Sequence, residues 1–416
     1  MNKINLKELL FNYASIVIMA LGGLLFSVII AAFYDAETLG LFNRSYSYYL
    51  VLSQLSTCGI HMAVLKMVSD ARDNIPEARN IFKSACFAVL VISVVLIMFS
   101  ELIINIFPMP EQRRKAIMFI IPALAFFSIN KVILNYINAR SEMIVFAIFQ
   151  SLRNIFICLG IIILISIKTA GVYLTSAFFL GEGTLLLIMS FYLFGKKDFS
   201  GKISLFHLKA LLPFGVKILP SNIVLEVNTK VDLLCLGWFI SDEAIIGVYS
   251  LVTLFTEGFY QVYMVMRRMI NPKLSLWIKD KTNWEEKYKY IRKICVYSAV
   301  PLDFLIISAF YLMILFLGKP IYNQGLVPLI IVASSIALNG LFIIYGNSMS
   351  QLGCPGKESI VNIITVGCNF LLNIVFIIHW GIIGAAVATA LSYCCFSIFI
   401  HNFIAKGLVR CRHLFI

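Results

Sequence analysis

The stretch Phe33-Tyr-Asp-Ala-Glu-Thr-Leu-Gly-Leu-Phe42 follows the first long apolar segment of the chain. A similar stretch, Phe239-Ile-Ser-Asp-Glu-Ala-Ile-Ile-Gly-Val-Tyr249, follows another apolar segment past the middle. Gly40 and Gly247 occupy the same place in both, with acidic residues a few positions before and an aromatic residue two positions after. A helix–acidic turn–Gly–helix unit that recurs about half a chain apart indicates two related halves.

The composition is that of a membrane protein. The chain is 60% hydrophobic and 13% charged, with a mean hydropathy of +0.91, values that soluble globular domains do not reach. A helix needs about 20 apolar residues to span the hydrocarbon layer. Twelve such spans are predicted, at about 11–33, 41–64, 84–107, 116–138, 143–166, 172–194, 211–239, 246–270, 291–317, 326–350, 359–379 and 383–405. We expect the first to stay as a helix, since Asp35 and Glu37 follow it and no small-residue cleavage site does.

The repeat predicts an all-α polytopic membrane protein whose 12 or so spans form two six-helix lobes. The polar stretch 196–210 falls after the sixth span and is the expected cytoplasmic linker between lobes at 1–195 and 211–416. Six spans return the chain to the same side of the membrane, so the lobes are expected to be parallel repeats. Internal repeats of this kind are typical of transporters.

The distribution of positive charge predicts the orientation. The net charge is +13, and most of the 34 lysines and arginines fall on the side of the N-terminus, above all within 267–293 and 196–209. By the positive-inside rule both termini are cytoplasmic. Because the charge is sorted by membrane side, we expect no nucleic acid as a partner.

Motifs of an enzyme or of a metal site are missing from the sequence. It has no Gly-rich phosphate loop, no HExxH and no GxSxG, and its cysteines show no zinc-ligand spacing. We therefore expect neither catalytic residues nor a metal. The informative residues are charges inside spans, because a charge at the bilayer centre costs about 2.5–3.5 kcal/mol and usually faces a partner or a wet cavity. The cations are Lys131, Arg153, Lys217 and Lys230, and the acids are Glu182, Glu226, Asp232, Glu257 and Asp303.

The seventh predicted span is the richest in polar residues. At 100° per residue, Asn222, Glu226 and Lys230 share one face, whereas Asn228 and Asp232 fall on another with Lys217 and Ser221. Both faces must border water or other helices. Pro220 is expected to kink the helix. The residues act either in substrate or ion handling or, for Glu226 and Lys230, as a structural ion pair.

Polar stripes also mark three other spans. Lys131 lies in a stripe of the fourth span, Arg153 in one of the fifth, and Asn369 in one of the eleventh that runs from Asn362 to Asn373. Such stripes either form hydrogen-bonded seams between helices or line a cavity that suits sugar hydroxyls.

Three stretches resemble a known family. They are Tyr34-Asp-Ala-Glu-Thr-Leu-Gly-Leu-Phe42, Gly59-Ile-His-Met-Ala-Val-Leu-Lys66 and Tyr136-Ile-Asn-Ala-Arg-Ser-Glu142. With the twelve spans, they are similar to Wzx-type polysaccharide (O-antigen or repeat-unit) flippases of the multidrug/oligosaccharidyl-lipid/polysaccharide exporter superfamily. The resemblance implies translocation of an undecaprenyl-diphosphate-linked oligosaccharide across the bacterial inner membrane by alternating access. A polymerase and a chain-length regulator of the same pathway are expected as partners beside the lipid.

The charges inside the spans fit such a substrate. A dehydrated diphosphate needs cations, which Lys131, Arg153, Lys217 and Lys230 supply, and Asn222, Asn228 and Asn369 suit the sugar hydroxyls. Glu226, Asp232, Glu257 and Asp303 are expected to couple transport to H⁺ or Na⁺, with no other cofactor. Two other readings stay open. One is a drug/cation antiporter of the same superfamily, which the many intramembrane cations disfavour. The other is a membrane-embedded polysaccharide polymerase, which the short loops disfavour.

Overall fold

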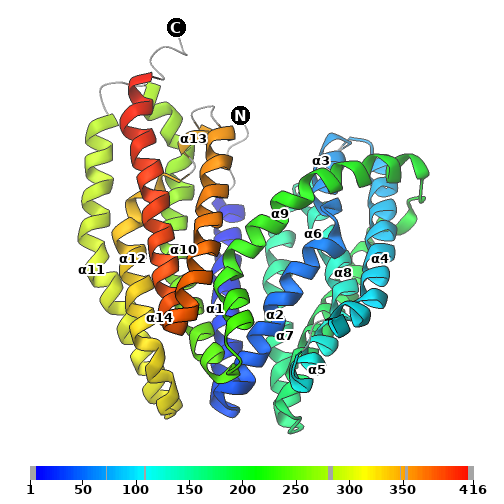
Figure 1. Cartoon of the computed structure of the whole chain (residues 1–416). Coiled ribbons are helices and arrows are strands. Elements are labelled where there is room, and N and C mark those ends of the chain that lie inside the picture. Colours follow the sequence, from blue (N-terminus) through cyan, green and yellow to red (C-terminus); the bar gives the residue numbers. More distant parts are fainter. Residues whose placement is uncertain are drawn as a thin grey trace. The chain divides into compact units, whose positions relative to one another are not determined.

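The chain is built from helices. The computed structural model describes residues 6–71, 73–106, 109–279, 284–346, 348–351 and 355–410 (Figure 1). Within these ranges the regular structure is α-helical with short 3-10 segments, and no strand occurs. The predicted all-α class is therefore confirmed.

Contacts divide the chain into two compact units, residues 1–230 and 231–416. The first unit contains α1 (Leu6–Phe33), α2 (Ala36–Thr57), α3 (Ile60–Asp70), α4 (Ile75–Ile106), α5 (Glu111–Ile120), α6 (Ala123–Ala139), α7 (Met143–Ser166), η1 (Gly171–Ser176), α8 (Ala177–Gly195), η2 (Asp198–Ser200) and most of α9 (Leu205–Phe239). The second contains the rest of α9, α10 (Glu243–Lys279), α11 (Trp284–Leu317), η3 (Pro320–Gly325), α12 (Leu326–Ile344), α13 (Ser348–Gln351) and α14 (Pro355–Arg410).

Each predicted span lies mainly in one helix or in two consecutive helices, as the second does in α2 and α3 and the fourth in α5 and α6. Among the described residues, eight helical runs are long and apolar enough to cross a membrane. Two bent pairs, α2 with α3 and the two parts of α9, raise the number to ten. The first predicted span lies in α1, and the last two share the single run 356–402.

The run shared by the last two spans is a helical hairpin. α14 reverses direction at Gly381, whose φ of 55° and ψ of −130° lie outside the helical range (Figure 1). Past the turn, a Cβ built on Gly384 would lie 2.1 Å from the Phe376 carbonyl oxygen, so only glycine permits this close approach of the two arms. The two arms correspond to the eleventh and twelfth predicted spans.

The repeated stretch has the same local structure in both units. Asp35 accepts a hydrogen bond from the Thr38 N–H at 2.8 Å at the start of α2, and Asp242 accepts one from the Ala244 N–H at 2.8 Å at the start of α10. An aspartate side chain here satisfies N–H groups that have no partner inside the helix. The acidic turn of the repeat is thus a helix N-cap.

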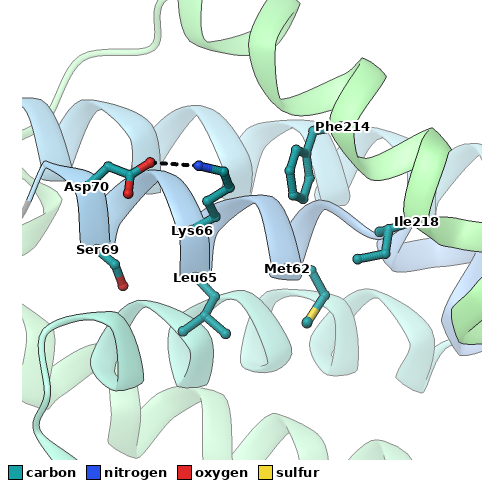
Figure 2. Close-up of a pocket in the computed structure, with 7 residues that line it drawn as sticks. All are labelled: Met62, Leu65, Lys66, Ser69, Asp70, Phe214 and Ile218. Atoms are coloured by element: carbon teal, nitrogen blue, oxygen red, sulfur yellow. Dashed lines mark hydrogen bonds and ion pairs between the residues drawn. The ribbon is translucent and has the colours of Figure 1, made fainter. Parts of the chain in front are cut away.

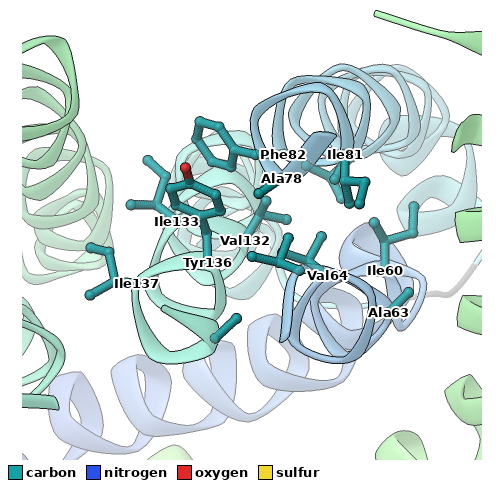
Figure 3. Packing of buried hydrophobic residues seen from close by; sticks show 14 of the residues in the cluster. Ile60, Ala63, Val64, Ala78, Ile81, Phe82, Val132, Ile133, Tyr136 and Ile137 are labelled. Carbon is teal, nitrogen blue, oxygen red and sulfur yellow. The ribbon is translucent and has the colours of Figure 1, made fainter. Parts of the chain in front are cut away.

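The helix of the fourth predicted span of each half, α6 in the first unit and α12 in the second, packs against several other helices of its unit. In the first unit α6 packs against α3, α4 and α8, and in the second α12 packs against α10, α11 and α14. The core around α6 is apolar, and Figure 3 shows Phe82, Val64 and Val132 packed beside Tyr136. Burying this surface against neighbouring helices fixes the direction in which the polar residues of α6 point.

Two bends interrupt the helices of the first unit. α2 and α3 meet at 47° at Cys58 and Gly59, both with positive φ. A Cβ on Gly59 would lie 2.4 Å from the carbonyl oxygen of Gly215 in α9, so the two backbones touch. α9 bends by 49° between Val224 and Glu226, about one turn after Pro220. The predicted kink in the helix of Pro220 is thus matched by a bend that lies about one turn after the proline.

The predicted linker 196–210 packs against α4. Asp198 is 1% exposed in its side chain and binds Arg79 at 3.1 Å and Arg140 at 2.8 Å. The backbone N–H groups of Lys202 and Ser204 donate to side chains of α4, Asn80 at 2.6 Å and Ser84 at 3.0 Å. The segment is therefore fastened to the first unit, and its role as the boundary between lobes stays a prediction.

Candidate functional site

A polar cluster in the first unit joins α2, α6 and α9 through one glutamine. The Gln54 side chain, in a residue only 3% exposed, accepts a hydrogen bond from the Lys131 ammonium at 3.2 Å and donates one to the Glu226 carboxylate at 3.1 Å. An amide can do both because its oxygen accepts and its nitrogen donates. The structure thus links a predicted substrate-binding cation to a predicted ion-coupling acid.

Arg153 lies close to this cluster and is paired with an acid. Its Nε lies 2.6 Å from Oε1 of Glu182, which is fully buried, and Asn130 donates to the other Glu182 oxygen at 2.8 Å. The Phe127 ring joins the two groups, with the Arg153 guanidinium 4.9 Å and the Lys131 ammonium 5.3 Å from its centroid. A cation over an aromatic face gains electrostatic stabilisation. Lys131 and Arg153 are therefore both within cation–π distance of the Phe127 ring.

The stripes of the fourth and fifth spans do not form a common seam through these cations. Lys131 points to Gln54 of α2, and Arg153 points to Glu182 of α8. Asn135 donates to the carbonyl oxygen of Lys131 in its own helix at 2.8 Å. Each stripe binds a different neighbouring helix, which spacing along one helix cannot reveal.

The other predicted residues of α9 have mixed surroundings. Lys217 and Asn228 are exposed, and their side chains make no hydrogen bond or ion pair with any residue that the structure describes. Asn222 is half-buried and its amide nitrogen is buried without a hydrogen-bond partner. Lys230 is 9% exposed. Of this span, Glu226 is hydrogen-bonded to Gln54 and so belongs to the cluster.

The second unit holds a different arrangement around Asp232. One carboxylate oxygen accepts from the Asn373 amide at 2.9 Å, and the other accepts from the Thr389 hydroxyl at 2.6 Å and the Tyr249 hydroxyl at 3.1 Å. Asn373 also donates to the side chain of the predicted Asn369 at 2.8 Å. The arms of the α14 hairpin and the start of α10 thus converge on the end of α9.

The aromatic residue that closes the repeated stretch differs in role between the two copies. Phe42 is 1% exposed and packs edge-on against Phe26 and face-on against Phe178, with centroids 5.8 and 5.6 Å apart. Its counterpart Tyr249 is fully buried and donates its hydroxyl to Asp232. One hydroxyl group therefore distinguishes a packing residue from a member of the polar cluster.

The two remaining predicted acids lie elsewhere in the second unit. Asp303 of α11 accepts a hydrogen bond from Ser334 of α12 at 2.8 Å, and its other oxygen is buried without a hydrogen-bond partner. Glu257 is half-buried in α10, near enough for its charge to act on Asp232.

Sequence reasoning missed the neutral members of both clusters. Gln54, Phe127, Tyr249 and Thr389 carry no charge, so nothing set them apart from other residues of their spans. The position of Tyr249 in the repeated stretch, beside an acid-rich span, was the one available signal.

A shallow groove lies near the first cluster, between α3 and α9. It has a volume of about 380 Å³, and Met62, Leu65, Phe214 and Ile218 form its apolar part (Figure 2). Lys66 lies at its rim, paired with Asp70 one turn away at 3.0 Å. Both charged side chains are more than half exposed, so this pair contributes little to stability.

Comparison with known proteins places the chain in a family. Residues 6–278, which include α1 to α9 and most of α10, match the family described as "Polysaccharide biosynthesis protein". The chain belongs to this family. A curated relative from Haloferax volcanii, the "probable low-salt glycan biosynthesis flippase Agl15", is 29% identical over 172 residues. That match covers 39% of this chain and about a third, 34%, of the relative.

Solved structures of two membrane proteins share the fold of this chain. The lipid II flippase MurJ in an inward closed conformation matches with a TM-score of 0.76 at 18% identity, over 97% of this chain and 90% of that one. An inward-facing multidrug resistance MATE family transporter of the MOP superfamily matches with 0.74 at 14% identity, over 94% and 95%. At these identities the likeness concerns the fold alone.

Proposed function

We propose that this protein is a flippase that moves a lipid-linked oligosaccharide across a membrane by alternating access. The finer proposal is an undecaprenyl-diphosphate-linked repeat unit for surface polysaccharide such as O-antigen. It places the chain in the bacterial inner membrane, with both termini in the cytoplasm and a polymerase and a chain-length regulator as pathway partners. The observation that carries it is the cluster of Lys131, Arg153 and Phe127 inside the apolar helices of a polysaccharide biosynthesis protein.

The geometry supports Lys131 as the main anion-binding residue. An ammonium has three N–H donors, and one of them binds the neutral Gln54 oxygen. Binding to an amide leaves the positive charge of Lys131 available to a diphosphate. Lys217, which is exposed on α9, is a second cation for the same substrate.

Arg153 takes a different part in this proposal. Its charge is balanced by Glu182 at 2.6 Å, but its Nη2 atom is buried without a hydrogen-bond partner. The pair adds little net charge to the site, and the two N–H groups of Nη2 are donors for a phosphate or sugar oxygen. The predicted roles of Asn222, Asn228 and Lys230 in substrate binding remain proposals of the same kind.

Coupling to an ion gradient is proposed for the second unit. Around Asp232 the structure gathers carboxylate, amide and hydroxyl oxygens, and Oδ1 of Asn373 is buried without a hydrogen-bond partner. Oxygen atoms of these kinds are the ligands that hard cations take in proteins. Asp232 is therefore the proposed H⁺ or Na⁺ site, ahead of Glu226, Glu257 and Asp303.

A deletion strain tests the proposed function. We expect loss of the surface glycan and accumulation of lipid-linked oligosaccharide on the inner leaflet. Plasmid-borne K131A should fail to restore the glycan, K131R should restore part of it, and K357A, which alters an exposed lysine outside the cluster, should restore it fully, all at equal protein level. Unpolymerised units on the outer face would indicate a polymerase instead, and an unchanged surface glycan would contradict the proposal.

The drug/cation antiporter remains the second candidate because of the match to the MATE transporter fold and the buried carboxylate at Asp232. Proteoliposomes loaded with a fluorescent organic cation separate the two functions. An antiporter would release the dye when a Na⁺ or H⁺ gradient is applied. A flippase would instead move a fluorescent polyprenyl diphosphate between leaflets.

A further inference from the structure

A second groove in the first unit lies away from both polar clusters. It has a volume of about 320 Å³ and runs between α4, α6 and α8. Cys86, Phe87 and Leu90 of α4 form one wall, and Ile129 and Ile133 of α6 form its floor. The lining is almost wholly apolar, which suits a hydrocarbon chain and not a sugar or an ion.

The groove is open on one side and covered at one end. Phe87 is 44% and Leu90 41% exposed, so the rim faces outward from the helices of its own unit. Phe199 and Ile203, which follow α8 in the segment fastened to α4, cover the end. The groove is thus open along the exposed side chains of Phe87 and Leu90, and residues of the segment 196–210 line its end.

Positive charge is found at that covered end. Lys83 is the charged residue of the lining, and its ammonium donates to the Phe199 carbonyl oxygen at 3.3 Å. Lys202 is exposed in the same segment. The next residues expose apolar side chains, with Leu205 75% and Phe206 74% exposed. Lysines beside exposed Leu and Phe are typical of a segment at the membrane–water interface.

We propose that this groove binds one acyl chain of an anionic phospholipid, with its phosphate at Lys83 and Lys202. The apolar slot matches the chain, and two lysines at one end match a single phosphate at the head of that chain. The orientation predicted from charge puts this end at the cytoplasmic leaflet, where anionic lipids are enriched. The bound lipid would hold segment 196–210 against α4.

The site is tested on the purified full chain in neutral detergent. Binding of phosphatidylglycerol and of phosphatidylcholine is measured by native mass spectrometry, and the rise of the unfolding temperature on adding each lipid is measured in parallel. C86W places a large side chain in the groove. K83A removes the positive charge at its covered end, and K83R keeps a positive charge there. K66A is the matched control, because it removes a lysine at the rim of the other groove (Figure 2).

We expect phosphatidylglycerol to bind and to raise the unfolding temperature more than phosphatidylcholine does. C86W should abolish this difference, and K83A should weaken phosphatidylglycerol binding about fivefold, the effect of about 1 kcal/mol per lysine. K83R and K66A should bind as the natural protein does.

Equal binding of the two lipids, or unchanged binding in both C86W and K83A, would overturn the proposal. Each variant is first checked without lipid for a monodisperse elution and an unfolding transition, so a folding defect is recognised separately.

Discussion

The two units stabilise charged side chains inside their helices with different kinds of partner. In the first, cations and acids are matched: Arg153 pairs with Glu182, and Gln54 connects Lys131 to Glu226. In the second, Asp232 is held by the neutral donors Tyr249, Asn373 and Thr389. Matched charges favour a fixed charge state, whereas a carboxylate held by neutral donors can exchange those bonds for a cation or a proton. We infer that anion binding belongs to the first unit and ion coupling to the second.

The largest expected effect comes from breaking the ion pair of the first unit. E182L leaves the Arg153 guanidinium buried without its acid, which costs about 3–5 kcal/mol of unfolding free energy. The double variant R153M/E182L should recover most of this loss, since neither charge is then buried. Unfolding in mixed micelles measures both. A double variant as unstable as E182L would show that Glu182 stabilises the unit without regard to Arg153.

The corresponding change in the second unit separates stability from ion dependence. D232A removes the acceptor of the Tyr249 and Thr389 hydroxyls, at about 1–3 kcal/mol each, whereas the Asn373 amide keeps its bond to Asn369. D232N keeps an oxygen and the shape of the side chain, so it should be clearly more stable than D232A and yet lose transport driven by an ion gradient. Transport by D232N that still responds to a Na⁺ or H⁺ gradient would move the coupling role away from this residue.

A smaller effect tests the single hydroxyl that distinguishes the repeats. Y249F removes one hydrogen bond to Asp232 while keeping the ring, so we expect a loss of about 1 kcal/mol and a weaker ion dependence. F42Y is the reciprocal variant, and its buried hydroxyl should cost more than Y249F does because Phe42 is packed among aromatic rings. If Y249F and F42Y both have negligible effects, the hydroxyl of Tyr249 contributes neither to stability nor to ion dependence.

The smallest expected effect concerns the ion pair between Glu142, just before α7, and Lys196, just after α8. Burial alone would raise the pKa of the Glu142 carboxyl, but hydrogen bonds from Lys196 and Tyr192 outweigh it and hold this pKa below its usual range. A lowered pKa means that the stabilisation is present above the unfolded-state value and is lost as the pH falls through the folded-state value. E142Q should therefore be slightly less stable at pH 7, by under about 1 kcal/mol, and equal to the natural protein well below pH 4. Unfolding temperatures across pH 3–7 measure this, and a constant difference would exclude the ion pair as its cause.

The spans and the repeat could be predicted because they depend on residues near one another in the sequence. Hydropathy located the segments, and the Asp–Gly spacing located the same N-cap at Asp35 and Asp242. A bend in the helix that contains Pro220 was predicted, and α9 does bend, about one turn after Pro220 and next to Glu226.

The candidate site could be predicted only in part. Lys131, Arg153 and Asp232 stood out because charges within apolar spans need partners, and the structure shows partners for all three. Which partners they bind depends on contacts between distant helices. Helical spacing put Lys217 and Asn228 on the same face as Asp232, yet both are exposed whereas Asp232 accepts three hydrogen bonds, because packing differs along the helix.

The hydroxyl of Tyr249 also bears on how two such units diverge after a gene duplication. Phenylalanine and tyrosine codons differ by one base, so a single point mutation at the position of Phe42 and Tyr249 interconverts an aromatic packing residue and a ligand to a buried carboxylate. Such a change keeps the aromatic ring, so the contacts of that ring with neighbouring helices can be retained. One base change can thus give one copy of a repeat polar chemistry while the other copy keeps only the aromatic packing.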